Sequence, residues 1–146
     1  MNILFVCTGN SCRSPLAESY CQKAAAETGL SEIRVHSAGT AASGGRISRN
    51  ARHVMREQNI TPASEQSRAV GSELVDWADI ILTMTGAHKQ DLEYMFPAAR
   101  GKAEVLGRYT RGGGEISDPI GGTLDDYRDC FENIKEAIDN FLESLG

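Results

Sequence analysis

The chain has 146 residues, which is enough for one domain of ordinary size and too few for a second independent core. Fifteen Lys and Arg against twenty Asp and Glu give a net charge of -5, which argues against broad capture of nucleic acid or of an anionic membrane surface. No run approaches about 18 consecutive apolar residues, and the first residues lack the basic leader of a signal peptide. We therefore expect a cytoplasmic protein with neither a nucleic-acid nor a membrane partner.

Predicted strands and helices alternate along the chain. Residues 2–6 form a β-prone apolar run that suits a strand buried on both faces. A loop of small and polar residues follows, and then a helix with Pro15 in its first turn and Gly29 at its end. Further strands are predicted at residues 33–37, 78–84 and 103–106, and further helices at 49–59, at 88–96 and after residue 123. Helical spacing gives the last helix an apolar stripe of Tyr127, Phe131, Ile134, Ile138, Phe141, Leu142 and Leu145.

This alternation predicts an α/β fold for residues 1–146, a single-domain Rossmann-like three-layer sandwich. Its centre would be a four-stranded parallel sheet with helices on both faces. Ligands of such sheets bind beyond the carboxyl ends of the strands. The loop at residues 7–14 follows the first strand and lies at that edge. We therefore expect a ligand at this loop.

The loop reads Cys7-Thr8-Gly9-Asn10-Ser11-Cys12-Arg13-Ser14 and leads directly into Pro15. Successive backbone N–H groups that curl into a helix N-terminus form a cradle for a dianion. Gly9 lets the backbone approach that anion closely, and the same positive field favours a Cys7 thiolate. Arg13 can bind two phosphate oxygens with its planar fork. The predicted phosphate-binding residues are Thr8, Gly9, Asn10, Ser11, Cys12, Arg13 and Ser14.

The loop, with Val6 before it and Pro15 after it, resembles the phosphate-binding loop of the low-molecular-weight protein tyrosine phosphatases. A Cys followed six residues later by an Arg is weak evidence alone, and here the preceding strand and following helix make it specific. Asp118-Pro119, in the glycine-rich segment before the last helix, also stands where that family has it. Ser37-Ala38-Gly39 after the second strand is similar too. The resemblance thus covers essentially the whole chain.

The resemblance implies a mechanism with a phosphocysteine intermediate. Cys7 would attack phosphorus, Arg13 would hold the phosphoryl oxygens, and Asp118 would act as general acid and then as general base. Ser14 would stabilise the departing sulfur, and Asn10 would hold the loop in its strained shape. The substrates would be phosphorylated proteins, and inorganic phosphate would be product and inhibitor. Neither a metal nor an organic cofactor is needed.

Two residues bear on the choice of phosphorylated side chain, Ser11 and Ile120. Family members that act on phosphotyrosine usually have a bulky aliphatic residue at the position of Ser11 and aromatic residues directly after Asp-Pro. This chain has neither, and it resembles the bacterial protein-arginine-phosphatase branch, which has a small hydroxyl residue, usually Thr, in the loop and Gly-Gly after the Asp-Pro segment. Residues 83–85 and 88–90 resemble that branch as well. Phosphoarginine is therefore the favoured substrate and phosphotyrosine the alternative, since Ser11 lacks the methyl group of Thr and Ile120 replaces the branch's usual aromatic residue.

The other cysteines and the histidines carry weaker signals. The resemblance implies that Cys7 and Cys12 could form a reversible disulfide that protects the nucleophile. The residues alone also allow Cys12 to be a small side chain that fills space at the base of the loop. Cys21 and Cys130 lie on apolar helix faces and are predicted to be core residues. The three histidines stand singly, which predicts surface or structural roles and, without any Cys-x-x-Cys pair, no metal site.

Three other functions fit the sequence less well. An arsenate reductase on this fold would need redox cysteines near residues 80 to 92, and none is present there. A catalytically silent phosphate-binding module would be expected to lose Cys7 or Asp118. A dinucleotide-binding domain would need a Gly-x-Gly-x-x-Gly or Walker-type loop after the first strand.

Overall fold

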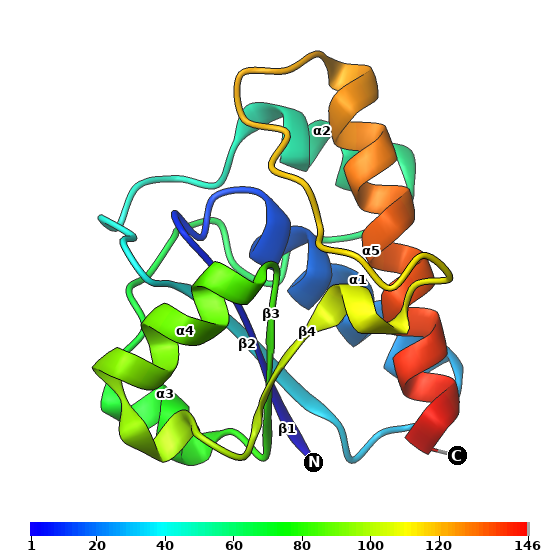
Figure 1. Cartoon of the computed structure of the whole chain (residues 1–146). Helices are drawn as coiled ribbons and strands as arrows, with labels where there is room; N and C mark the ends of the chain where they lie inside the picture. The colour runs from blue at the N-terminus through cyan, green and yellow to red at the C-terminus, as the bar shows by residue number, and fades with distance from the viewer. Residues whose placement is uncertain (146) are drawn as a thin grey trace.

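The computed structural model describes residues 1–145, and its centre is a four-stranded sheet with the order β2-β1-β3-β4. All three neighbouring strand pairs are parallel, which confirms the predicted α/β architecture (Figure 1). The strands are β1 (Asn2–Cys7), β2 (Arg34–Gly39), β3 (Ile80–Thr83) and β4 (Ala103–Val105). The helices are α1 (Arg13–Glu27), α2 (Arg49–Glu57), α3 (Ser72–Trp77), α4 (Gly86–Met95) and α5 (Leu124–Leu145), with short 3-10 turns η1 (Pro97–Ala99) and η2 (Leu106–Tyr109).

The central strand β1 is buried on both faces, as its unbroken apolar run predicts. Ile3 and Phe5 point to one face of the sheet, where they join the core beneath α1, α2 and α5. Leu4 and Val6 point to the other face and join a smaller core beneath α3, α4 and η1. Side chains alternate in direction along a strand, so four successive apolar residues are what a sheet covered on both faces requires. This pattern accounts for the three layers in Figure 1, in which helices cover both faces of the sheet.

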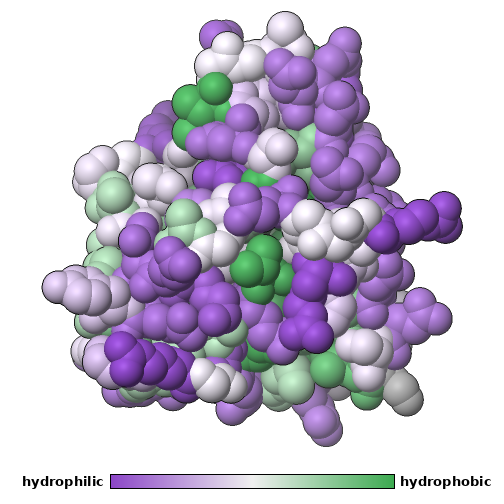
Figure 2. All heavy atoms as spheres, in the orientation of Figure 1, coloured by the Kyte–Doolittle hydropathy of each residue, from purple (hydrophilic) through white to green (hydrophobic). Residues whose placement is uncertain are grey.

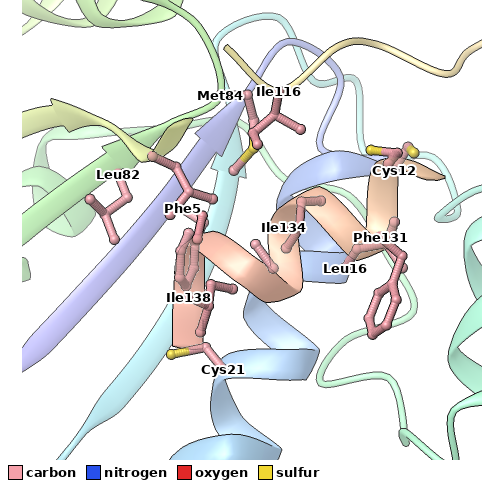
Figure 3. Close-up of a cluster of buried hydrophobic side chains, with 14 of the residues drawn as sticks. Phe5, Cys12, Leu16, Cys21, Leu82, Met84, Ile116, Phe131, Ile134 and Ile138 are labelled. Atoms are coloured by element: carbon pink, nitrogen blue, oxygen red, sulfur yellow. The ribbon is translucent and has the colours of Figure 1, made fainter. Parts of the chain in front are cut away.

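The larger core is built mainly by β1, α1 and α5. Figure 3 shows Phe5 of β1, Leu16 of α1 and Ile134 of α5 among the side chains that meet there. Six of the seven residues of the predicted α5 stripe are buried, and Leu145 is the exception at 39% exposure. Including Leu145 in the stripe was wrong, because the last turn of α5 extends beyond the cluster that its earlier residues join.

The sequence indicates helix α5 clearly and helix α3 not at all. At the start of α5, Thr123 Oγ1 accepts the Asp126 N–H and Asp126 Oδ2 accepts the Thr123 N–H, and the two bonds together form a capping box. Helix α3 was not predicted at all. Its six residues make too few turns to show an apolar period, and only Val75 among them is buried, where the helix packs near β1 and η1.

The outer surface on the face seen in Figure 2 is mostly hydrophilic, with hydrophobic residues in small separate patches. The large apolar residues that are exposed are Met1, Tyr94, Met95, Ile120 and Leu145. Within residues 1–145, no helix has the length and apolar character that a membrane crossing requires.

Candidate active site

Two loops meet at the carboxyl edge of the sheet, and both carry predicted site residues. The Cys7 loop (residues 7–14) joins β1 to α1, and the Asp118 loop (residues 115–123) leads into α5. In Figure 1 both lie at the end of the sheet opposite the N terminus. This is where parallel α/β sheets bind ligands, so the fold brings the predicted residues to the expected edge.

The Cys7 thiol is buried at the end of β1, and its sulfur lies 2.9 Å from Ser14 Oγ. Asn10 Nδ2 donates a hydrogen bond of 2.7 Å to the same Ser14 oxygen. Because that oxygen accepts from the Asn10 amide, the Ser14 hydroxyl hydrogen is free to point at the Cys7 sulfur. The arrangement supplies a hydrogen-bond donor to a thiolate at this position.

The backbone of the Cys7 loop presents unpaired donors. Within residues 1–145, none of the N–H groups of Thr8 to Cys12 has a protein acceptor. Helix α1 begins at Arg13, and its N-terminus receives no capping bond from the Cys12 side chain. Several unpaired N–H groups beside a helix N-terminus form a cradle for an anion with more than one oxygen.

Asn10 holds this loop in an unusual shape, with φ at 51°. Besides its bond to Ser14, its amide donates to Ser37 Oγ at 3.0 Å, and its carbonyl accepts the Arg68 N–H at 2.8 Å. The Ser37 hydroxyl in turn donates to Glu18 Oε1 at 2.6 Å. Burial raises the pKa of Glu18, while the Ser37 hydrogen bond and the Arg68 charge oppose that shift. A buried polar network thus fixes the loop that carries the thiol.

The Ser37-Ala38-Gly39 segment at the end of β2 has a clear physical reason for its glycine. A Cβ on Gly39 would collide with the carbonyl oxygen of Thr8 and crowd the Asn10 N–H. The next residue, Thr40, donates its N–H to the Cys7 carbonyl at 2.9 Å. Only glycine permits the end of β2 to lie this close to the Cys7 loop.

We predict that Asn10→Gly lowers the free energy of unfolding by about 2 kcal/mol, because the network loses two buried hydrogen bonds and one partly buried one. Asn10→Ala should cost about 0.5–1 kcal/mol more, since the penalty for a Cβ at positive φ exceeds the unfolded-state entropy that Ala saves. Urea unfolding of both variants measures these values. Equal stability of Asn10→Gly and the unaltered protein would contradict the role of the network.

Arg13 and Asp118 face each other across the site. Arg13 is buried and donates from one terminal nitrogen to the Ile116 carbonyl at 2.9 Å. Its other terminal nitrogen lies 3.5 Å from Asp118 Oδ2. The Asp118 side chain is 44% exposed, and its second oxygen accepts the Ile120 N–H at 3.0 Å. A buried cation therefore stands beside a carboxylate that solvent and substrate can reach.

The Asp118 loop is anchored at one end and exposed at the other. The Ile116 N–H donates to the Met84 carbonyl at 3.0 Å, and the Gly86 N–H donates to the Glu115 carboxylate at 2.6 Å. Beyond these anchors, a cavity of about 300 Å³ opens beside Asp118. It is lined by Ser117, Asp118, Pro119, Ile120, Gly122, Asp126, Asp129, Cys130 and Asn133. A larger cavity, of about 620 Å³, lies near Arg68 and α3, and neither Cys7 nor Asp118 lines it.

The two predicted selectivity residues lie on these two loops. Ser11 is half-buried, and its carbonyl accepts the Ser48 N–H at 2.6 Å, which fixes it against the start of α2. Ile120 is 61% exposed, two residues after Asp118. Neither position holds an aromatic side chain that could stack on a phenyl ring.

All four cysteines are buried free thiols, as predicted for Cys21 and Cys130. The Cys130 thiol lies close to Cys12, and this contact, together with burial, raises the pKa of the Cys12 thiol. Cys12 therefore stays protonated at neutral pH. The Cys7–Cys12 disulfide that the resemblance implies stays a prediction.

Sequence reasoning missed three residues that contact the predicted ones. Glu18 and Arg68 belong to the Asn10 network, and His88 contacts Thr8 through Nε2 at 2.7 Å. Glu18 could have been found from the sequence, because a carboxylate on the buried face of a helix needs a polar partner. Arg68 and His88 approach from distant segments, so no local pattern marks them.

A family model described as low molecular weight phosphotyrosine protein phosphatase matches residues 2–146. A protein-arginine-phosphatase of Geobacillus stearothermophilus is 38% identical over 145 residues, covering 98% of this chain and 95% of that protein. The low molecular weight protein-tyrosine-phosphatase PtpB of Staphylococcus haemolyticus is 37% identical over 139 residues, covering 94% and 95%.

A solved structure has nearly the same fold over nearly the whole length. It is a Cys-to-Ser mutant of the YwlE arginine phosphatase with a phosphorylated active site serine. The TM-score is 0.93 at 35% sequence identity, and the match covers 99% of this chain and 95% of that one.

Proposed function

This chain belongs to the low molecular weight phosphotyrosine protein phosphatase family, and we propose that it removes phosphoryl groups from protein side chains, with phosphoarginine favoured. The observation that carries the proposal is the Cys7 thiol, placed 2.9 Å from Ser14 Oγ at the base of a loop of unpaired N–H groups. Asp118 stands at the other side of the site beside Arg13.

In the first step the Cys7 thiolate attacks phosphorus, so that a sulfur–phosphorus bond forms and the bond to the leaving group breaks. The loop N–H groups and the Arg13 guanidinium hold the three remaining phosphoryl oxygens as charge redistributes over them. Asp118 supplies the proton that the leaving group takes. The 44% exposure of the Asp118 side chain suits a proton donor that must meet a substrate arriving from solvent.

In the second step water attacks the phosphocysteine. The Asp118 carboxylate takes a proton from that water, and the sulfur–phosphorus bond breaks to release inorganic phosphate. The Ser14 hydroxyl donates to the departing Cys7 sulfur, a role supported by the 2.9 Å contact and by the Asn10 amide that orients it. Neither step calls for a metal or an organic cofactor.

The proposed substrate class rests on Ser11 and Ile120. A guanidinium leaving group offers several N–H donors to hydroxyl and carboxylate oxygens such as those of Ser11 and Asp118. A phenyl ring would instead gain from flat aromatic walls, and the exposed Ile120 offers none. The protein-arginine-phosphatase relative supports the same choice. Phosphotyrosine is the alternative, supported by the PtpB relative.

The remaining parts of the proposal follow from this reaction. The partners are phosphorylated proteins, and inorganic phosphate is a product that inhibits by occupying the Cys7 loop. Residues 1–146 act as one phosphatase domain, for which the family match over residues 2–146 is the support. A cytoplasmic location is part of the same proposal.

Matched peptides that carry phosphoarginine or phosphotyrosine test the substrate class. We expect a higher kcat/KM on phosphoarginine, and we expect Ser11→Ile to shift the ratio of the two kcat/KM values toward phosphotyrosine by about tenfold or more. Ser11→Thr is the matched control, because it keeps the hydroxyl and should keep the preference. A preference for phosphotyrosine in the unaltered protein would overturn the phosphoarginine assignment and leave the phosphatase chemistry intact.

A further inference from the structure

His88 is a buried histidine whose two ring nitrogens both have partners at the active-site edge. It lies in the first turn of α4 and is 6% exposed. Nε2 is 2.7 Å from Thr8 Oγ1, and Nδ1 is 3.0 Å from Thr85 Oγ1. Thr8 is the residue directly after the Cys7 nucleophile. The imidazole thus connects α4 to the loop that binds phosphate.

Thr85, the N-cap of α4, favours one arrangement of the hydrogens in the hydrogen bonds that link Thr85, His88 and Thr8. Thr85 Oγ1 accepts the backbone N–H of His88 at 3.2 Å, and its own hydroxyl hydrogen is available to donate to Nδ1, 3.0 Å away. With Nδ1 accepting, a neutral ring carries its hydrogen on Nε2 and donates it to Thr8 Oγ1. The Thr8 hydroxyl hydrogen is then free, because this oxygen has no other protein partner within residues 1–145.

The ring is held neutral by its surroundings. Burial and the Arg13 charge lower the pKa of His88, against the opposing charges of Asp91, Asp118 and Glu115. The positive N-terminal end of α4 acts in the same direction as Arg13. A neutral ring has one hydrogen only, so the direction of both hydrogen bonds is determined by which nitrogen carries it.

We propose that His88 is a positioning residue for the phosphatase reaction: its Nε2–H fixes the Thr8 hydroxyl so that the hydroxyl hydrogen points out of the Cys7 loop toward the substrate. Thr8 is an exposed residue of the loop, whereas Cys7 directly before it is buried, and the hydrogen bond between the Thr8 hydroxyl and His88 is only partly buried. There the hydroxyl adds one side-chain donor to the backbone donors that face the phosphoryl oxygens and the leaving group. The inference rests on the proposed function of this loop.

The test compares side chains of different reach. The amide of His88→Gln reaches the position of Nε2 and can donate to Thr8, whereas that of His88→Asn reaches only the position of Nδ1. We expect His88→Asn to lower kcat on a phosphoarginine peptide about tenfold and to leave KM within about twofold. A tenfold loss is the size expected when one hydrogen bond to a charged group is removed from the transition state. His88→Gln should retain kcat within about threefold. His53→Asn changes a histidine on α2 whose side chain is 45% exposed; it is the control and should match the unaltered protein.

A double-mutant cycle separates positioning from folding. Thr8→Val should lower kcat as much as His88→Asn, and adding His88→Asn to Thr8→Val should lower it no further. Ring-nitrogen NMR of the unaltered protein should show the Nε2–H form of His88. The inference is overturned by full activity of Thr8→Val or His88→Asn, by an equal loss from His88→Asn in both backgrounds, or by an Nδ1–H ring. None of these outcomes touches the phosphatase assignment, which depends on Cys7.

Discussion

Cys7→Ser is expected to lower kcat by about 10⁴-fold or more, because a hydroxyl does not ionise at neutral pH as a thiol does and is a far weaker nucleophile than the thiolate. The fold should survive, since serine differs from cysteine by one atom and Ser14 Oγ remains 2.9 Å from the substituted atom's position as a hydrogen-bond partner. Steady-state hydrolysis of a phosphoarginine peptide, together with thermal unfolding, measures both expectations.

The same variant gives a second, more specific readout. A serine at this position that is phosphorylated slowly should keep its phosphoryl group, as in the related mutant structure with a phosphorylated active site serine. Intact-protein mass spectrometry after incubation with substrate should therefore find one added phosphoryl group on Cys7→Ser and none on Cys7→Ala. Retention of full activity by Cys7→Ser would contradict the whole mechanism.

Asp118→Asn is expected to lower kcat by about 10²- to 10⁴-fold on substrates whose leaving group must be protonated. The loss should be much smaller in the first step for p-nitrophenyl phosphate, whose leaving group departs as a stable anion. A burst of nitrophenol before slow turnover would then appear, because the variant also lacks the base for hydrolysis of the phosphocysteine. Rapid mixing with absorbance detection measures the burst.

Asp129→Asn is the matched control for Asp118→Asn. It removes a carboxylate that lines the same 300 Å³ cavity and leaves the Arg13 contact intact. Its kcat should equal that of the unaltered protein. An equal loss in both variants would assign the effect to the charge of the cavity and would contradict a proton transfer by Asp118.

The parts of the fold that could be predicted are those whose signal is local. The central strand β1 is one unbroken apolar run, and α5 shows a helical stripe over six turns with a capping box at its start. Helix α3 was missed because six residues are too few to establish a period. Leu145 was misplaced for a related reason, since a periodic stripe does not indicate where its packing partners end.

The candidate site divides in the same way. Cys7, Arg13 and Ser14 belong to one continuous loop, and residue type and spacing were enough to find them. Their support could not be read from sequence, because it comes from Glu18, Arg68 and His88 on three different segments. A hydrogen bond between residues 80 positions apart leaves no periodic pattern in either segment. The histidine that appeared isolated in sequence is thus fully hydrogen-bonded in the fold.

The central claim is that the phosphoryl group passes through Cys7. Rapid acid quenching of the unaltered protein during turnover of a phosphoarginine peptide, followed by mass spectrometry, tests it most directly. The account predicts a phosphoryl group on the Cys7 sulfur that appears before free phosphate and disappears as substrate is exhausted. Release of phosphate at full rate with no phosphoryl group on Cys7 at any quench time, or with the group on another residue, would contradict it.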